Sequence, residues 1–256
     1  RVDKGDRSNR YDEAASRACE WIVGMQSSNG GWGAFEPENT HLYLNNIPFA
    51  DHGALLDPPT ADVSARCLAM LCQLGQMPAN SEPAARALRY LLDEQEADGS
   101  WFGRWGTNYI YGTWSALCGL NAAGIGTDAP EMKRAAQWLL SIQNEDGGWG
   151  ESGDSYKLEY RGYEKAPSTA SQTAWAMLGL MAAGAGDHPA LVRGVEYLLR
   201  TQASHGFWDE PYFTAVGFPR VFYLRYHGYS RFFPLWALAR FRNLLRDGNR
   251  AITWGL

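Results

Sequence analysis

A short pattern built on Gln and Trp recurs four times in this chain and constrains its fold more than any other feature. In each copy an aromatic residue precedes an aliphatic one, a Gln lies five positions after the aromatic residue, and a Trp lies six positions after the Gln. The copies comprise Trp21, Gln26 and Trp32; Tyr90, Gln95 and Trp101; Trp138, Gln143 and Trp149; and Tyr197, Gln202 and Trp208. Each copy leads from an apolar segment with helical periodicity into a Gly-rich turn, so the pattern predicts a junction between a helix and the following loop.

The chemistry of these two residue types favours a structural role. The Gln side chain carries donors and an acceptor for the backbone groups that a helix end leaves unpaired, and the Trp side chain buries a large apolar area. We therefore expect the four Trp residues of the loops to be buried. We expect the Gln residues to hold neighbouring outer helices together rather than to act in catalysis.

Each repeat is predicted to form a hairpin of two helices. The predicted pairs are residues 14–27 with 62–76, 83–96 with 109–123, 129–144 with 168–183, and 189–203 with 231–246. The second helix of every pair is the more apolar, which is typical of a buried helix and predicts two layers with the second helices inside. Thr60 or Asp57 is a candidate cap for the helix that begins at residue 62. Strand signals are nearly absent.

The sequence thus predicts an all-α fold, an α/α barrel or toroid of helical hairpins. A closed ring of six hairpins would need about twelve helices, so the eight expected here form an incomplete ring. We expect a polar lead or linker at residues 1–13 and one barrel domain at residues 14–256. Because the chain starts at Arg1 without an initiator Met, a fragment or a processed chain is expected.

Composition excludes some classes of function. The net charge is -5 and the pI is about 5.6, without the basic stripe that nucleic-acid binding normally requires. Four Cys residues lie in helical patterns without a CxxC pair, which is typical of reduced, buried thiols in a cytosolic protein. No apolar stretch reaches the roughly 18 residues of a membrane-spanning helix, and no signal peptide is visible.

Seven blocks of sequence resemble the squalene-hopene cyclase family in their order along the chain. They read WIVGMQSSNGGWGAF, NNIPFADHG, LDPPTADV, DGSWFGRWGTNYIYGTW, QNEDGGWGE, STASQTAWA and FWDEPYFTAVGFPRVFYLRY. The repeated Gln/Trp pattern likewise resembles the QW motif of these cyclases. The resemblance implies a two-domain protein of α-barrels, of which this chain matches the C-terminal part, and it implies no metal or cofactor.

The same resemblance implies the substrate and the reaction. Squalene is cyclised to hopene or hopanol after an Asp of a DxDD motif protonates its terminal alkene, and no DxDD occurs in this sequence. The chain alone is therefore expected to be inactive and to need the N-terminal part of the protein. The implied setting is the cytoplasmic side of a bacterial membrane, with peripheral or monotopic contact and a possible homodimer.

Aromatic side chains are candidates for the cavity wall. Were the segment helical, Phe218, Phe222, Tyr226, Tyr229 and Phe233 would share one face, and their spacing alone is equally typical of an ordinary core stripe. The resemblance implies cavity positions for the first four of them. It implies cavity positions for Phe35 and Trp105 as well, and a substrate-binding position near the acid for Tyr111. Packing within loops and turns is the alternative for Trp105 and Tyr111.

Three polar residues are candidates for a network that supports the proton donor. The resemblance implies this role for Asp57 and Asp62, although both could merely cap a helix start. Arg66 stands where the family pattern has a His, and it could instead form an i,i+4 pair with Asp62. Phe35 stands where the pattern often has a Tyr. Phe49 and Ala50 match the constriction of the substrate channel, with a buried loop anchor as the alternative.

Two other classes of α/α barrel stay open on the sequence. A zinc prenyltransferase β subunit would need an Asp, Cys and His ligand set, for which the five His residues lack a convincing Cys partner. A non-catalytic glycan-binding toroid would need exposed Trp residues and paired acids in an open groove.

Overall fold

The computed structural model describes residues 11–49, 55–157 and 162–248, and within them it contains the eight expected helices. Ala50 lies outside the described residues. The helices are α1 (Asp12–Gly24), α2 (Ala61–Gln73), α3 (Glu82–Asp93), α4 (Tyr109–Ala122), α5 (Pro130–Ser141), α6 (Ala170–Ala182), α7 (Pro189–Thr201) and α8 (Tyr229–Asp247). Short 3-10 helices, η2 (Leu42–Asn46) and η4 (Gly153–Tyr156), lie in the long loops.

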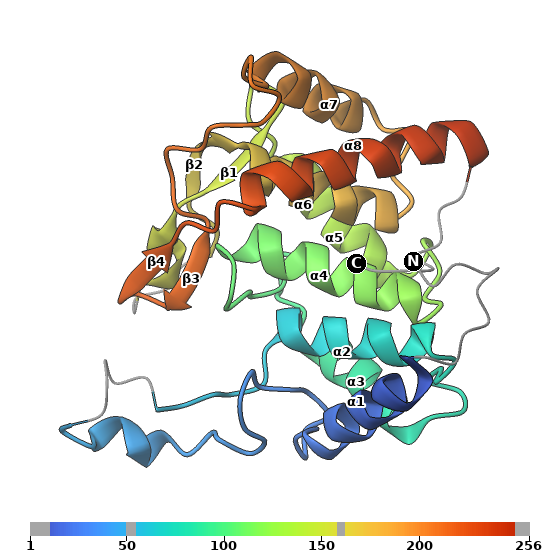
Figure 1. Ribbon diagram of the computed structural model, residues 1–256, viewed down its shortest axis with the longest axis vertical. Helices are drawn as coiled ribbons and strands as arrows, with labels where there is room; N and C mark the ends of the chain where they lie inside the picture. The colour runs from blue at the N-terminus through green and yellow to red at the C-terminus, as the bar shows by residue number, and fades with distance from the viewer. Residues whose placement is uncertain (1–10, 50–54, 158–161, 249–256) are drawn as a thin grey trace.

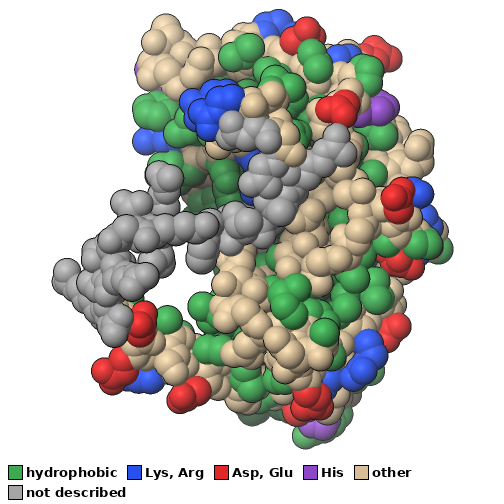
Figure 2. Space-filling model, turned by 90° about the vertical axis from the view of Figure 1, so that its right-hand side faces the viewer, with side chains coloured by type: hydrophobic (Ala, Val, Ile, Leu, Met, Phe, Trp, Pro, Cys, Tyr) green, Lys and Arg blue, Asp and Glu red, His purple; other side chains and the backbone are tan. Residues whose placement is uncertain are grey.

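The helices form two layers, as the apolarity of the second helices predicted. The inner helices α2, α4, α6 and α8 pack side by side in this order, and α3, α5 and α7 cover them from outside (Figure 1). All residues of α6 and nearly all of α4 are buried, so neither helix has a solvent face. The arrangement is that of an open α/α barrel. Figure 2 shows the face of the molecule where the C-terminal ends of the inner helices lie. Charged side chains gather along the outer edge of this face.

Local sequence explains where several helices begin. The outer helices α3, α5 and α7 carry a Pro in their first two positions, where its missing N–H costs nothing. The Thr169 side chain accepts a hydrogen bond from the backbone N–H of Gln172 and caps α6. The expected cap of α2 is wrong: Thr60 occupies the N-cap position, but its side chain makes no capping bond.

The near absence of strands is also wrong in part. Strands β1 (Trp149–Glu151) and β2 (Lys165–Thr169) pair antiparallel, as do β3 (Ala215–Phe218) and β4 (Phe222–Leu224). In the second sheet Phe218 and Phe222 are direct partners across a turn. Backbone bonds from the loop before α4 attach β3 to the barrel, because Thr107 donates to Thr214 and Val216 donates to Trp105.

The four Gln/Trp patterns join helix to loop as predicted. The helix of each copy ends one or two residues before the Gln. The indole N–H of each Trp donates to the backbone carbonyl ten residues earlier, at 2.7–2.8 Å, and thereby fixes the loop on its own helix. The four Trp side chains, Trp32, Trp101, Trp149 and Trp208, are all buried.

Candidate functional site

The candidate residues gather at the N-terminal ends of the inner helices. Asp62 and Arg66 belong to the first half of α2, Tyr111 to the first turn of α4, and Tyr229 is the first residue of α8. These helix ends lie on the side of the molecule that carries β3 and β4 (Figure 1). Helix N-termini carry partial positive charge, so this side favours carboxylates.

Asp57 organises the loop that carries Phe35. Its buried carboxylate accepts hydrogen bonds from the backbone N–H groups of Ala34, Phe35 and Glu36, at 2.5–3.0 Å. Asp57 therefore fixes the backbone of a loop and does not cap α2. The role of Asp57 in a network that supports the proton donor stays a prediction.

Asp62 plays the same part for the loop that carries Trp105. Its Oδ2 atom accepts hydrogen bonds from the backbone N–H groups of Arg104 and Trp105, at 3.1 and 2.9 Å. Its Oδ1 atom is buried and has no partner among the described residues. The Trp105 ring packs edge-on against Phe35, with ring centres 5.7 Å apart. The two carboxylates thus bring two predicted cavity residues into contact.

Arg66 pairs with Tyr111 and not with Asp62. Its guanidinium donates a hydrogen bond of 2.8 Å to the Tyr111 hydroxyl and lies 5.0 Å from the centre of the Trp114 ring. Tyr229 lies beside the same hydroxyl, close enough for the two Tyr side chains to affect the pKa of each other. Burial raises the pKa of Tyr111, while the Arg66 charge opposes the shift. At neutral pH Tyr111 therefore keeps its own hydroxyl proton.

An aromatic wall continues from Tyr111 across three inner helices. Trp114 of α4 and Trp175 of α6 stack with ring centres 6.1 Å apart, and Phe233 of α8 packs edge-on against both. The ring centres of Tyr229 and Trp175 lie 5.7 Å apart. Trp114 and Trp175 were not among the residues predicted from the sequence, although both stand in the most apolar helices, where a large aromatic residue must face a neighbouring helix.

The C-terminal aromatic residues do not share one helical face, because the segment before α8 is not helical. Phe218 and Phe222 lie on opposite strands of the β3–β4 hairpin, where their rings pack edge-on at 5.3 Å. Tyr226 follows β4, and only Tyr229 and Phe233 share a helix. Tyr226 nevertheless lies 5.2 Å from Tyr229 between ring centres. The β3–β4 hairpin, and not a helix face, therefore places Phe218 and Phe222 at the end of the barrel where the inner helices begin.

Two further carboxylates were not predicted from the sequence: Glu151 is buried and Glu210 is half-buried. Glu151 accepts hydrogen bonds from the backbone N–H groups of Asn108, Tyr109 and Ile110 at the start of α4, at 3.0–3.1 Å. Glu210 accepts from the backbone N–H and the hydroxyl of Ser171 at the start of α6. Each acid stands two residues after the Trp of its Gln/Trp pattern, in GWGE and FWDE, and this shared position was the available signal.

Burial perturbs both of these acids. It raises the pKa of Glu151 to about 7, although the three backbone N–H groups at the start of α4 oppose the shift. Burial also raises the pKa of Glu210, against the hydrogen bonds from Ser171. Glu151 orients the first turn of α4, which contains Tyr111, and is therefore connected to the candidate site through the backbone.

Of the two channel candidates, Phe49 belongs to the described residues and Ala50 does not. Phe49 is 88% exposed on the long excursion between α1 and α2, so it is not a buried loop anchor within the described residues. Leu42 and Tyr43 of η2 are also largely exposed on this excursion. The role of Phe49 and Ala50 in a channel stays a prediction.

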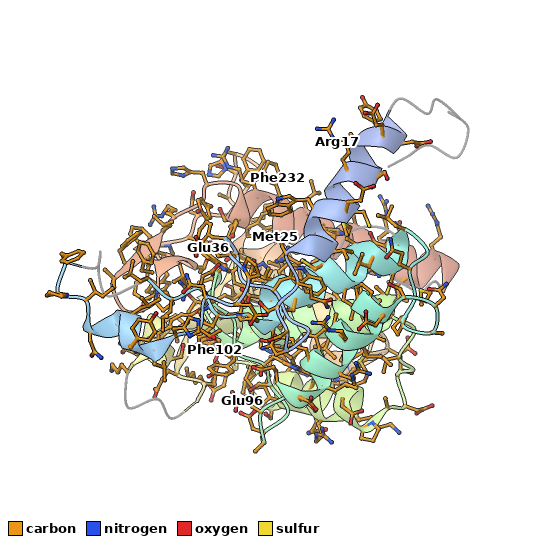
Figure 3. All side chains as sticks on the ribbon, turned by 90° about the horizontal axis from the view of Figure 1, so that it is seen from below. Arg17, Met25, Glu36, Glu96, Phe102 and Phe232 are labelled. Atoms are coloured by element: carbon orange, nitrogen blue, oxygen red, sulfur yellow. The ribbon has the colours of Figure 1, made fainter. Side chains whose placement is uncertain are left out.

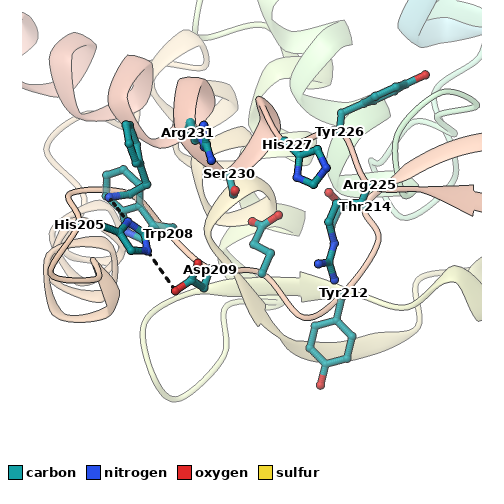
Figure 4. Close-up of a pocket in the computed structure, with 12 residues that line it drawn as sticks. His205, Trp208, Asp209, Tyr212, Thr214, Arg225, Tyr226, His227, Ser230 and Arg231 are labelled. Carbon is teal, nitrogen blue, oxygen red and sulfur yellow. Dashed lines mark hydrogen bonds and ion pairs between the residues drawn. The ribbon is translucent and has the colours of Figure 1, made fainter.

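A separate pocket of about 420 Å³ lies beside the fourth Gln/Trp pattern. Trp208 and Glu210 line it from the loop, Arg225 from the segment before α8, and Arg231 from α8 itself (Figure 4). The candidate residue Tyr226 also borders it. Across the described ranges, no three His, Cys, Asp or Glu side chains come together as metal ligands. None of the described helices is both long and apolar enough to cross a membrane.

Comparison with solved structures places the fold among α/α barrels. A type II terpene cyclase from Scytonema, solved with geranylgeranyl dihydroxybenzoate, matches with a TM-score of 0.57 and 21% identity over 82% of this chain and 55% of its own. A possible member of the GH105 family from Salmonella enterica matches with a TM-score of 0.61 and 16% identity over 93% of this chain and 67% of its own. At such identities the matches concern the fold alone.

Sequence comparison is more specific. The model of the squalene-hopene cyclase C-terminal domain matches residues 1–243. A squalene-hopene cyclase of Bradyrhizobium diazoefficiens is 63% identical over 246 residues, which cover 96% of this chain and 37% of the relative. The chain thus spans little more than a third of the length of this relative. On these matches, the chain belongs to the family of squalene-hopene cyclase C-terminal domains.

Proposed function

We propose that this chain is the C-terminal part of a triterpene cyclase, an isomerase that converts squalene to hopene or hopanol. The observation that carries the proposal is the contact between aromatic side chains and polar supports at the N-terminal ends of the inner helices, in a chain of this family. The whole enzyme would take its proton donor from a DxDD segment in its N-terminal part. The 256-residue chain alone would then be inactive.

In the proposed reaction the π electrons of the terminal alkene of squalene take a proton from the donor Asp. The resulting carbocation is attacked by the next alkene, and each ring closure moves the positive charge along the chain. The last cation then loses a proton to give hopene, or takes up one water molecule and loses a proton to give hopanol. The faces of the aromatic wall suit this charge, because a ring face stabilises a cation by about 0.5–2 kcal/mol without bonding to it. The apolar side chains keep out water, which would otherwise trap the cation.

The polar residues of the chain would act around the donor and not on the substrate. Asp57 and Asp62 hold the loops of Phe35 and Trp105, so they would set the shape of the cavity. Arg66 would favour the ionised form of a nearby donor Asp, making the protonated donor a stronger acid that is less populated. Because Arg66 already binds Tyr111, the two residues would act as one unit.

The partners and location are proposed on chemical grounds. Squalene dissolves only in lipid, so the whole protein would contact the cytoplasmic side of a bacterial membrane as a monotopic protein. Phe49 and Ala50 would border the channel through which squalene enters. The N-terminal part of the protein is the necessary partner, and a homodimer is compatible with the proposal. No cofactor is required for this chemistry.

The test is to place the N-terminal part of the Bradyrhizobium relative before Arg1 and to incubate the fused protein with squalene. Gas chromatography with mass spectrometry is expected to detect pentacyclic hopene or hopanol. The 256-residue chain alone and a fused variant with Asn for the donor Asp are expected to give none. A fused protein that unfolds cooperatively but converts neither squalene nor another polyprenoid would contradict the proposal.

A further inference from the structure

Three of the four Gln/Trp patterns join their own loop to the next outer helix. Gln26 donates through Nε2 to the carbonyl of Gly30 in its loop, at 2.8 Å, and to that of Pro83 in the first turn of α3, at 2.9 Å. Gln95 bonds in the same way to Gly99 and to Glu131 of α5. Gln143 bonds to Gly147 and to Ala190 of α7. We call this pair of bonds the clamp.

An Arg of the next helix completes each clamp. It follows the accepting residue by three positions, at Arg86, Arg134 and Arg193. Arg86 donates to the carbonyls of Ser27 and Ser28 in the loop. Arg134 and Arg193 donate to the Oε1 atoms of Gln95 and Gln143. The incoming helix is thus recognised by a backbone carbonyl in its first turn and an Arg one turn later.

A buried Gly permits this close approach. A Cβ atom added to Gly30 would lie 2.6 Å from the carbonyl oxygen of Arg86, and one added to Gly147 would lie 2.7 Å from that of Arg193. Gly99 approaches Arg134 in the same way. All three adopt positive φ angles and are buried. Contact with the next helix therefore accounts for the burial of these Gly residues.

The fourth copy has the same local geometry without this contact. Gln202 donates to the carbonyl of Gly206 at 2.8 Å, and Trp208 is bonded to its own helix like the other three Trp residues. Gly206 has a φ of +85°, close to the +94°, +97° and +87° of the other copies. Yet Gln202 and Gly206 are exposed, and a Cβ atom added to Gly206 would meet nothing within 4 Å.

The other edge of the array carries the complementary element. In α5, the clamp residues Glu131 and Arg134 precede the Gln of their own helix, Gln143, by twelve and nine residues. In α1, Ala14 and Arg17 precede Gln26 by the same two spacings. The Arg17 side chain is exposed near the start of α1, away from the other helices (Figure 3). Trp21 is 61% exposed, whereas its counterparts in the other copies are buried. The helical array is therefore open at both edges within the described residues.

We infer that the loop of Gln202 and Gly206 is a docking site for the first turn of an outer helix from the N-terminal part of the whole protein. The docked helix offers a first-turn carbonyl to Gln202 and has an Arg three residues later. This inference rests on the proposed function, because the partner is the rest of the cyclase. The loop is already in its bound geometry, so docking requires little reorganisation.

The test compares Gln→Ala variants at two clamps, each in the 256-residue chain and in the fused protein described above. Gln143→Ala is the matched control and is expected to lower the melting temperature by about 2–4 °C in both contexts. Gln202→Ala is expected to lower it by a similar amount in the fused protein and by clearly less in the 256-residue chain, where Gln202 loses only its exposed bond to Gly206. The readout is stability, so it does not depend on cyclase activity.

Several results would overturn the inference. One is a fused protein whose melting temperature does not change on Gln202→Ala. Another is a Gln202→Ala variant whose melting temperature falls equally in the fused protein and in the 256-residue chain. Docking of a second copy would appear as concentration-dependent association of the 256-residue chain that Arg17→Ala abolishes in sedimentation. A fused protein that shows the expected Gln202 effect but no cyclisation would retain the docking site and refute the proposed function.

Discussion

The guanidinium of Arg66 donates a 2.8 Å hydrogen bond to the hydroxyl of Tyr111, and its central carbon lies 5.3 Å from the centre of the same ring. One side chain thus binds both the oxygen and the ring of its neighbour. The bond joins α2 to α4 at the end where the candidate residues gather. Because Arg66 is half-buried, its partner contributes to stability as well as to the proposed chemistry.

Tyr111→Phe is expected to destabilise the chain by about 1–3 kcal/mol. The change removes the acceptor of Arg66 and leaves a charged donor without its partner, which costs more than the bond itself contributes. Urea denaturation measures the effect. Tyr229→Phe is the control, because it removes another Tyr hydroxyl beside Tyr111 and leaves the Arg66 bond in place. Equal losses in the two variants would contradict the account of Arg66.

Glu151→Gln is expected to flatten the dependence of stability on pH between about 5 and 7. Burial raises the pKa of Glu151 to about 7 in the folded chain, above its ordinary value of 4.5. The folded state therefore binds more protons than the unfolded state in this range, and stability falls as pH rises through 7. Thermal melts across the range measure the slope.

The matched control for this change is Glu145→Gln, which alters an exposed Glu in the same loop region. It is expected to keep the wild-type slope. Burial raises the pKa of Glu210 as well, and that contribution is common to all three proteins. A Glu151→Gln variant with an unchanged slope would show that Glu151 is ionised throughout the range.

Gly99→Ala is expected to cost more stability than Gly206→Ala. Both residues have positive φ angles, so each substitution carries backbone strain of about 1 kcal/mol. Only at Gly99 would the new Cβ atom also lie 2.8 Å from the carbonyl of Arg134 in the next helix, and such crowding adds about 1–3 kcal/mol. Urea denaturation of the two variants checks the difference. Equal losses of stability in the two variants would show that the contact with Arg134 is not the reason why Gly occupies position 99.

The thiols of Cys67, Cys72 and Cys118 are expected to react slowly with a thiol reagent at pH 8 until the chain unfolds. Burial raises their pKa values to about 12, 11 and 12, so the reactive thiolate is scarce in the folded state. All four cysteines are free. Ellman's reagent should therefore label these three at a rate that follows unfolding. Rapid labelling of the folded protein would contradict their burial.

Most of the fold was predictable because its signals are periodic. The eight helices and the two layers follow from apolar spacing, and the clamps follow from a pattern that repeats without change of length. The β3–β4 hairpin was missed because a spacing of four residues suits both a helix face and a short hairpin. Pro219 could have decided between them, since a Pro is disfavoured inside a helix, and Arg220 in the turn has a positive φ angle.

The polar half of the site was harder to predict. Asp57 and Asp62 could be identified as acids near a helix start, but their partners are backbone groups of loops that lie 21–43 residues away in sequence. No local pattern encodes such contacts. Arg66 illustrates the same limit, because its choice of Tyr111 over Asp62 depends on how α2 and α4 pack.

The clamps also constrain how the length of the chain can change. In all four outer helices an Arg precedes the Gln by nine residues, so each helix presents one connector at its start and another at its end. One inserted residue would rotate these connectors by about 100° relative to each other and move them 1.5 Å apart along the axis. An insertion inside an outer helix thus disturbs two neighbours at once. Insertions and deletions should therefore accumulate in the long loops before the inner helices.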